Sequence, residues 1–600
     1  MRPFASEPWR QGAKIVIGFD IGTTQTAVSF TYLYPGGLQS LHRVVQWPGQ
    51  ENDGGEAKIP SLVWYDSSGQ ACAFGAEART PEVLDKAEDE EWRLAQHFKL
   101  HLHPASSTQN ADELVLDPLP FGVTIEQIYA DFMGYIFRQT EKYFKERIME
   151  GETKWSSLED SIELVVAHPN GWDIREQGVL RNATVDANIM PSLYVAQERV
   201  HFVSEAEAAV HFVLLHADFD NGLKVSDDFV VCDAGGSTVD TTLYSVDETE
   251  PLIRLKEKRA SACVQAGAIF VNQAAKEHFA RAFAGAGLGD EAASEFTSAA
   301  MESFEASAKR RFEDPAEDKI ISVGGRKFTN AKLSVRRGSM TVAGAQLQQF
   351  FDPSVKRIIE SVTAQIEGHA VKYILLVGGF GESPYLRQKL RDGPGSMNGI
   401  KVTIAEQPTS KAVADGAVIW FVRHAVTARA TRYAFGTPIM IPTGHAQGER
   451  MGGRKVIDDF RGSYFGGAWK ELVPRGQILD NSADIRSCTF FGDYGSETPD
   501  LGSITVEIYV FEGTRPPPAF ILDRKDNIVP GFRLICEIEA DLSGLSGTLA
   551  RNHGPKGAYW TIEYSIALKF GGTELRASLV WIEKGVMRRG PASIIPVSQI

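Results

Sequence analysis

The chain has 600 residues, of which 43% are hydrophobic and 23% are charged, and its formal net charge is −15. A chain of this length is too long for one hydrophobic core, so we expect at least two compact domains. The excess of acidic residues argues against nonspecific binding to nucleic acid or to an anionic membrane surface, because both depend on positive charge.

The cysteines and the N-terminus bear on the compartment in which the protein resides. The five cysteines are scattered, with neither a Cys-x-x-Cys motif nor a histidine pair at zinc spacing, which is typical of reduced thiols. The first residues contain no apolar run of signal-peptide length, and no stretch is long and apolar enough to span a membrane. We therefore expect a cytoplasmic protein that binds neither nucleic acid nor membrane.

The first predicted elements are two strands joined by a tight turn, within residues 14–30. The first strand is apolar and β-branched and ends at Asp20, and the turn that follows contains Gly22, Thr23 and Thr24. Glycine lets a phosphate approach the backbone N–H groups closely, and the threonine hydroxyls add donors. An acid beside a phosphate needs a cation between them, and Mg²⁺ prefers such oxygen ligands. Taken alone, the stretch is explained more simply as an ordinary hairpin.

The next part of the chain alternates between helices and strands. An amphipathic helix is predicted from Thr124, a capping residue with Gln127 three positions later, to residue 147. Further strands are predicted at residues 162–167 and 200–203, and further helices at 175–188 and 205–216. This alternation is typical of an α/β fold.

Residues 229–246 repeat the pattern of the first hairpin. An apolar strand ends at Asp233, and the following turn and returning strand contain Gly235, Gly236, Ser237 and Thr238. A third glycine turn, at Gly378 and Gly379, follows another apolar strand and leads into a helix. Two facing hairpins of this kind clamp the β- and γ-phosphates of a nucleotide if Asp20 and Asp233 hold Mg²⁺ through water, and the third turn can then accept the nucleoside.

The predicted secondary structure changes near residue 431. Before it, helices are predicted at residues 267–284, 291–312, 342–367 and 411–428, with a β-rich insert at 320–333. After it, helical periodicity gives way to short alternating strands at residues 505–511, 533–539, 559–569 and 575–582. We therefore expect a nucleotide-binding domain at residues 1–431 and an antiparallel, β-rich domain at residues 432–600.

With its three turns in this order, the first part of the chain resembles the nucleotide-binding domain of the seventy-kilodalton heat-shock chaperone family, in the actin and sugar-kinase superfamily. Four further motifs fall in the family's order, at residues 181–187, 205–209, 267–272 and 309–312. The β-rich region stands where the family has its peptide-binding sandwich, and no helical lid follows it, which resembles the divergent, lid-lacking branch. The resemblance implies a two-lobed, actin-like α/β domain with duplicated five-stranded sheets and flanking helices.

The resemblance also implies roles for individual residues. Lys99 would reach the γ-phosphate, Glu205 and Asp233 would orient the attacking water, and Thr238 would complete the catalytic set with Asp20. The same two aspartates, Asp20 and Asp233, would hold Mg²⁺ through water. The residues expected to bind ATP or ADP are Gly22, Thr23, Thr24, Gly235, Gly236, Ser237, Asp240, Gly267, Glu305, Lys309, Arg310, Gly378, Gly379 and Phe380.

Three of these assignments have a simpler alternative, and the sequence departs from the family in places. Lys99 can be an ordinary surface lysine, Glu205 an acid favoured by the helix dipole, and Lys309 with Arg310 part of a solvated helix face. Phe380 begins a run that replaces the family's small hydroxyl residues and adenine-packing arginine, so that packing is either lost or replaced by the Phe380 ring. Glu305 lies four residues before Lys309, one more than in the family but still on the same helical face.

The sequence therefore predicts a Mg-ATP-binding, heat-shock-chaperone-like protein with weak ATP hydrolysis and nucleotide-gated binding of polypeptide clients or a partner protein, assisted by co-chaperones. An alternative is a non-hydrolysing, nucleotide-sensing scaffold, which the altered nucleoside turn favours. A small-molecule kinase of the same superfamily is a third alternative, against which the β-rich C-terminal region argues.

Overall fold

The computed structural model describes residue 4 and residues 7–51, 57–104, 116–216, 222–250, 252–404, 411–445, 454–481, 484–571, 574–590 and 593–596. Its contacts divide the chain into two compact units. The N-terminal unit comprises Met1–Trp172, Val179–Lys256 and Ser261–Val426, and the C-terminal unit comprises Asp173–Gly178, Glu257–Ala260 and Thr427–Ile600. The domain boundary expected after residue 431 stays a prediction.

The first sheet of the N-terminal unit has the strand order β3-β2-β1-β8-β9, with β4 added beside β2. The bounds of its strands are β1 Lys14–Ile21, β2 Gln25–Leu33, β3 His42–Arg43, β4 Lys58–Pro60, β8 Glu163–His168 and β9 Val200–Ser204. Strand β1 is antiparallel to β2 and parallel to β8. It is almost wholly buried, which explains why its sequence is a continuous apolar run.

The second sheet of this unit repeats the arrangement of the first. Its order is β18-β17-β10-β11-β12, with β13 beside β11. The bounds are β10 Asp228–Ala234, β11 Thr238–Glu248, β12 Arg254–Glu257, β13 Ala262–Gln265, β17 Val371–Val377 and β18 Lys401–Ile404. Strand β10 is antiparallel to β11 and parallel to β17, as β1 is to β2 and β8. The expected duplicated, actin-like fold is therefore confirmed, but the sheets have more than the expected five strands, because β4 adds to the first and β13 to the second.

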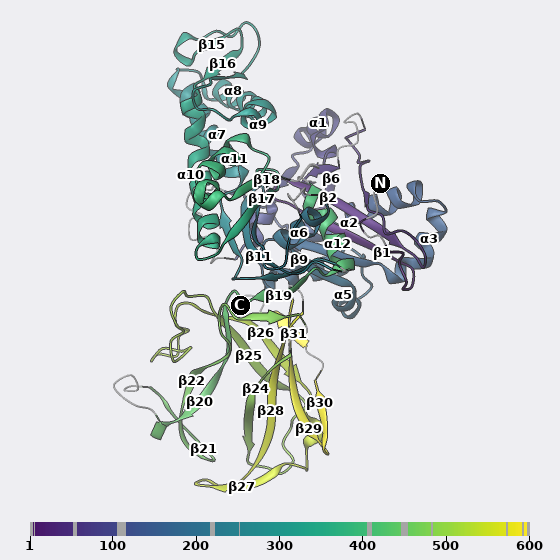
Figure 1. Cartoon of the computed structure of the whole chain (residues 1–600), viewed down its shortest axis with the longest axis vertical. Coiled ribbons are helices and arrows are strands. Elements are labelled where there is room, and N and C mark those ends of the chain that lie inside the picture. The colour runs from purple at the N-terminus through teal and green to yellow at the C-terminus, as the bar shows by residue number, and fades with distance from the viewer. Residues whose placement is uncertain are drawn as a thin grey trace. The chain divides into compact units, whose positions relative to one another are not determined.

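Helices flank both sheets (Figure 1). Their bounds are α1 Pro81–Asp89, α2 Ile125–Arg147, α3 Gly151–Leu158, α4 Ile174–Asp186, α5 Leu193–Arg199, α6 Glu205–His216, α7 Ala268–Gly285, α8 Asp290–Ser303, α9 Lys309–Arg311, α10 Gly344–Ile366, α11 Pro384–Asp392 and α12 Ala412–Arg423. The Thr124 hydroxyl accepts a hydrogen bond from the Gln127 N–H, so the predicted cap of α2 is confirmed. The helix predicted to reach residue 428 was too long, because His424 takes a left-handed conformation and ends α12.

Two small sheets extend the N-terminal unit. Strands β5 (Leu62–Tyr65), β6 (Ala71–Phe74) and β7 (Arg93–Gln96) form one of them. Strands β14 (Lys319–Ser322), β15 (Val335–Arg336) and β16 (Ser339–Val342) form the other, which is the β-rich insert expected from the sequence.

Helices α6 and α12 pack between the two large sheets. One buried cluster contains Val16 and Val165 from the first sheet, Ala208 and Ala417 from the two helices, and Val231 from the second sheet. The small residues let the helix backbones approach closely. The shared apolar layer fixes both sheets on the same pair of helices.

The C-terminal unit is a sandwich of antiparallel strands. One sheet has the order β21-β22-β20-β25-β26-β31, and the other has the order β24-β28-β29-β30 with β27 beside β28. The bounds are β20 Ala434–Pro442, β21 Val456–Asp459, β22 Gly462–Val473, β24 Asp484–Tyr494, β25 Ile504–Phe511, β26 Phe532–Ala540, β27 Ala550–Gly554, β28 Gly557–Gly571, β29 Glu574–Glu583, β30 Val586–Arg589 and β31 Ser593–Pro596, while β19 Val426–Ala430 pairs with β23 Ile478–Asp480. Ile508 and Ile538 of one sheet share a buried cluster with Ile566 and Leu579 of the other. Among the described residues after position 423, none is in an α-helix.

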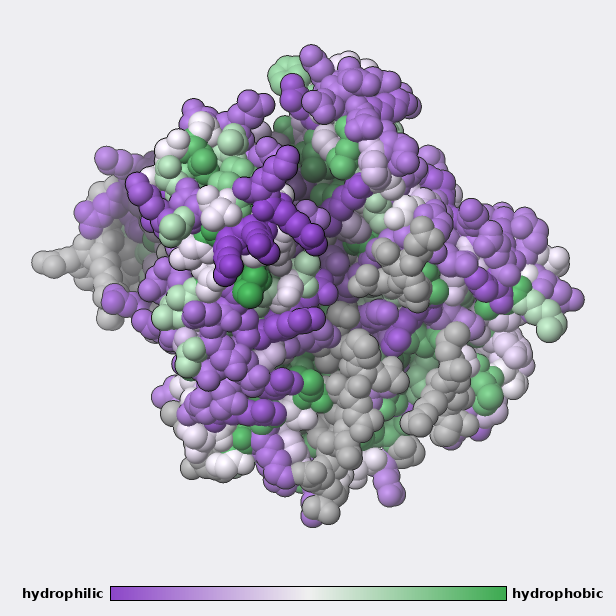
Figure 2. Space-filling model, turned by 90° about the horizontal axis from the view of Figure 1, so that it is seen from above, coloured by the Kyte–Doolittle hydropathy of each residue, from purple (hydrophilic) through white to green (hydrophobic). Residues whose placement is uncertain are grey.

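The surface in Figure 2 is mostly hydrophilic, with apolar residues in small groups. Within the described ranges, no helix is both long enough and apolar enough to cross a bilayer.

The closest approach between α6 and α12 occurs at Gly416, and it provides a test of this packing. A methyl group on Gly416 would lie 1.8 Å from the carbonyl oxygen of Ala208. We expect Gly416→Ala to lower the free energy of unfolding by about 1–3 kcal/mol, because one helix must move away from the other. Denaturant unfolding measures the change. Gly285→Ala is the matched control, because its added methyl group meets no atom within 4 Å. Equal stability of the two variants would contradict the packing.

Candidate functional site

The three glycine turns line one cavity of about 720 Å³ in the N-terminal unit. The sequence-predicted residues that line it are Asp20, Gly22, Thr23, Thr24, Lys99, Glu205, Asp233, Gly235, Gly236, Ser237, Thr238, Glu305, Lys309, Arg310, Gly378, Gly379 and Phe380. Asp240 and Gly267 do not line it. Residues that lie more than 350 positions apart in the sequence thus meet around one space.

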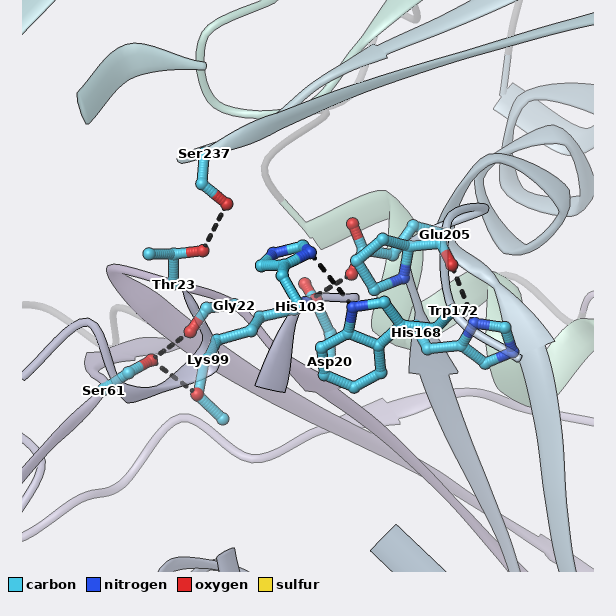
Figure 3. A network of polar contacts seen from close by, with 12 residues as sticks. Asp20, Gly22, Thr23, Ser61, Lys99, His103, His168, Trp172, Glu205 and Ser237 are labelled. Carbon is cyan, nitrogen blue, oxygen red and sulfur yellow. Dashed lines mark hydrogen bonds and ion pairs between the residues drawn. The ribbon is translucent and has the colours of Figure 1, made fainter. Parts of the chain in front are cut away.

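The turns that follow Asp20 and Asp233, named the Asp-Gly turns from here on, have the same backbone hydrogen bond and contact each other. The N–H of Gly22 donates to the carbonyl of Gln25 at 3.1 Å, and the N–H of Gly235 donates to the carbonyl of Thr238 at 3.0 Å. A hydrogen bond of 2.6 Å joins the hydroxyls of Thr23 and Ser237 (Figure 3). Hydroxyls and turn backbone of both sheets therefore face the same space, as a phosphate-binding clamp requires.

Asp20 and Asp233 occupy equivalent places in the two sheets. Asp20 pairs with Ala27 across the hairpin and with Ala167 of β8, and Asp233 pairs with Asp240 and with Val377 of β17. Both residues are buried, with 6% and 4% of their whole-residue surface exposed. The duplicated fold thus brings two acids to corresponding strand ends beside the cavity.

The environment of these acids is short of positive charge. Burial raises the pKa of Asp20. The nearby charge of Lys58 lowers this pKa, and the charge of Glu205 raises it. Burial also raises the pKa of Asp233 well above its ordinary value, and the charges of Glu205, Asp240 and Asp20 raise it further. A cation entering the cavity would favour the ionised form of both aspartates.

Lys99 is a buried residue of the cavity wall, so it is not an ordinary surface lysine. It lies in a short 3₁₀ turn, Phe98–Leu102, which begins after the left-handed residue His97. Its ammonium donates to a carboxylate oxygen of Glu205 at 2.5 Å and lies 5.6 Å from the centre of the Trp172 ring. Figure 3 shows Lys99 extending toward Glu205 beside Asp20. This ion pair joins Lys99 to Glu205, the first residue of α6.

Asp240 and Gly267 neighbour the residues of the cavity wall. Asp240 is buried directly opposite Asp233 in the β10–β11 ladder. A methyl group on Gly267 would lie 2.5 Å from the carbonyl carbon and oxygen of Gly236, so glycine is needed for the second turn to rest on the start of α7. Both residues shape the site without reaching the cavity.

The third turn lies against the second aspartate. Gly378 has φ +83°, and a methyl group there would lie 2.3 Å from Oδ1 of Asp233. Phe380 borders the cavity but is only 3% exposed, and its ring centre lies 6.2 Å from that of Phe351 in the core of the second sheet. Little of the Phe380 ring is therefore left for a base to stack on. Glu382, from the same turn, also lines the cavity.

The extra residue between Glu305 and Lys309 is absorbed by a π-helical turn. The helix is π-helical over Phe304–Ala308, which widens one turn by a residue. Both side chains line the cavity, as residues four apart on one helical face can. The Lys309 ammonium donates to the carbonyl of Ala268 at 2.9 Å and to the side chain of Asn272 at 2.6 Å. Burial lowers the pKa of Lys309 to about 8.

Several lining residues were not predicted from the sequence: Gln25, Lys58, Arg79, Ala268, Ile269, Asn272, Glu302, Ala306, Phe351, Glu382, Ser383, Lys411 and Val413. Lys58 had no local sequence signal, because it opens a short apolar run whose place is set by pairing with the strand after the first turn. Ser61 follows on the same run, and its hydroxyl donates to the carbonyl of Gly22 at 2.7 Å.

The residues fit a magnesium ion held through water. Oδ2 of Asp233 is buried and has no hydrogen-bond partner among the described residues. Across the described positions, no group of three or more His, Cys, Asp or Glu side chains could hold a metal by itself. Two carboxylates beside a phosphate cradle suit Mg²⁺, because this ion keeps several waters and takes the rest of its ligands from phosphate.

Comparison with known proteins finds distant relatives of the chain. No protein-family profile matches the chain. Human heat shock 70 kDa protein 12A is 21% identical over 95% of this chain and 90% of its own length. Mouse heat shock 70 kDa protein 12A is 21% identical over 94% and 89%, and human heat shock 70 kDa protein 12B is 21% identical over 67% and 68%. At this low identity, the chain resembles heat shock 70 kDa proteins along most of its length.

The depressed pKa of Lys309 gives the Hsp70-like site a testable pH dependence. The ammonium is charged below pH 8 and loses its proton as the pH rises through that value. We expect the affinity for ATP to fall several-fold between pH 7 and pH 9, because a cation beside the anionic ligand is lost. Calorimetric titration at both pH values measures the change. Lys309→Arg should remove this dependence, since arginine stays charged. If the ATP affinity of Lys309→Arg falls between pH 7 and pH 9 as much as that of the wild type, Lys309 is not the source of the pH dependence.

Proposed function

We propose that the N-terminal unit binds Mg-ATP in this cavity and hydrolyses it slowly, and that nucleotide occupancy controls the binding of polypeptide clients or a partner protein by the C-terminal unit. The contact between the Asp-Gly turns of two duplicated sheets, through Thr23 and Ser237, carries the proposal. Around that contact lie buried acids, a buried lysine and backbone N–H groups, which suit an anion bound together with a divalent cation.

Different residues of the chain have different roles in the proposed hydrolysis. Asp233 and Glu205 accept hydrogen bonds from a water and orient it for in-line attack on the γ-phosphorus. Lys99, already paired with Glu205, offsets the negative charge that gathers on the γ-phosphoryl oxygens while the bond to the bridging oxygen breaks. Bound Mg²⁺ supplies charge neutralisation at the β- and γ-phosphates. The products are ADP and phosphate.

Binding of metal and nucleotide can be tested at Asp20. We expect Asp20→Ala to weaken binding of ATP in the presence of Mg²⁺ by about tenfold or more, which corresponds to about 1.4 kcal/mol. Isothermal titration calorimetry with Mg-ATP and Mg-ADP measures the affinities. Asp117→Ala is a control on an exposed side chain in the same unit that does not line the cavity. Tight binding to the wild type that survives Asp20→Ala would contradict this role for Asp20.

Turnover separates the proposed enzyme from a nucleotide-sensing scaffold. Two observations favour the scaffold: the Phe380 ring lies in the core, and Glu382 stands at the third turn. We expect the wild type to release phosphate from ATP slowly and Asp233→Asn to release none, because the oriented water loses an acceptor carrying a full charge. A phosphate-release assay, with ATP binding of each protein confirmed by calorimetry, decides between them. Equal release by both proteins would favour the scaffold.

Client binding can be measured on the full chain. The described part of the C-terminal unit exposes large apolar side chains, among them Ile457, Phe491 and Ile582, on its antiparallel strands. We expect ATP and ADP to give different affinities for an unfolded, fluorescently labelled polypeptide, measured by anisotropy. In Asp20→Ala the two nucleotides should give the same affinity. A wild type whose client affinity ignores the nucleotide would contradict the gating.

A further inference from the structure

Lys58 brings a second ammonium group to the acidic end of the cavity. It opens β4 and pairs with Ala27 in the strand that follows the first turn. Its Nζ lies 3.5 Å from Oδ2 of Asp20, and the two side chains are 14% and 8% exposed. The backbone is fixed on the other side, because the side-chain amide of Gln50 donates to the Lys58 carbonyl at 3.0 Å.

The ammonium of Lys58 is paired with Asp20, and Lys58 and Asp233 line the same cavity. Lys99 is already engaged, since it forms a 2.5 Å ion pair with Glu205. Lys58 therefore lies where it stabilises the two aspartates, within the region that a divalent ion would share.

We propose that Lys58 is a resident counter-cation for the Asp20–Asp233 pair, which lets the cavity hold a nucleoside triphosphate with much of its affinity when no divalent metal is bound. The inference rests on the proposed function of the cavity. A lysine has a flexible stem and three N–H donors, so the ammonium can turn from the carboxylate to a phosphate oxygen when Mg²⁺ takes over the aspartates. The chain would then be less dependent on magnesium than a site with acids alone.

The test compares ATP affinity with and without magnesium. The measured quantity is the ratio of the Kd in excess EDTA to the Kd in excess Mg²⁺, determined by calorimetry for each protein. For the wild type we expect a ratio of about ten or less, because Lys58 replaces part of the charge of the metal. For Lys58→Met we expect a ratio at least about tenfold larger than the wild-type ratio, with most of the loss in EDTA.

Two matched controls isolate the effect of position and charge. Lys58→Arg keeps the charge and should keep the wild-type ratio. Lys411→Met removes an ammonium from a residue that lines the same cavity without an ion pair to Asp20, and it should leave the ratio unchanged. Unfolding midpoints show that each variant is folded, and Lys58→Gln replaces Lys58→Met if the methionine variant is not.

The outcomes separate this inference from the function on which it rests. Equal weakening of Lys58→Met in EDTA and in Mg²⁺ would make Lys58 a simple phosphate ligand and overturn the inference, while Mg-ATP binding would stand. Complete loss of wild-type binding in EDTA would also overturn it. No wild-type binding even with Mg²⁺ would overturn the proposed function and the inference together. A larger ratio in Lys58→Met alone supports the inference.

Discussion

The structure of the N-terminal unit depends on one electrostatic constraint: two carboxyl groups lie buried at the ends of apolar strands. Burying an acid is costly unless hydrogen bonds or a cation compensate it. Duplication of the sheet places Asp20 and Asp233 at equivalent positions, so the cost arises twice around one cavity. Lysines, glycine turns and hydroxyls surround the two acids, and the proposed cation would compensate the charge that these groups leave.

Much of the fold was readable from the sequence because the large strands are apolar on both faces. A strand that is buried almost throughout, such as β1, appears in the sequence as a continuous apolar run, and the aspartate near its end is easily recognised. The turn sequences after Asp20 and Asp233 repeat, which revealed the duplication. The antiparallel strands after residue 500 were also readable, because half-buried strands alternate between apolar and polar residues.

The rest of the site could not be read in this way, because it is set by pairing across the fold. Lys58 comes from a strand of three residues whose place is decided by its register against β2, and no local pattern records that register. Asp240 was expected to bind the nucleotide; it lies beside Asp233 in the ladder and does not line the cavity. The Phe380 ring packs against Phe351, a neighbour contributed by a distant helix. The end of α12 was misjudged because an apolar strand follows the left-handed His424 with no proline or glycine between them.

The π-helical turn at Phe304–Ala308 has a consequence for how the cavity wall is built. In an ordinary α-helix each residue advances by about 100°, so residues four apart lie on one face. The π turn changes this rotation between Glu305 and Lys309, and both side chains line the cavity. Deleting one residue from this turn would therefore rotate Lys309, and the helix after it, about the helix axis relative to Glu305.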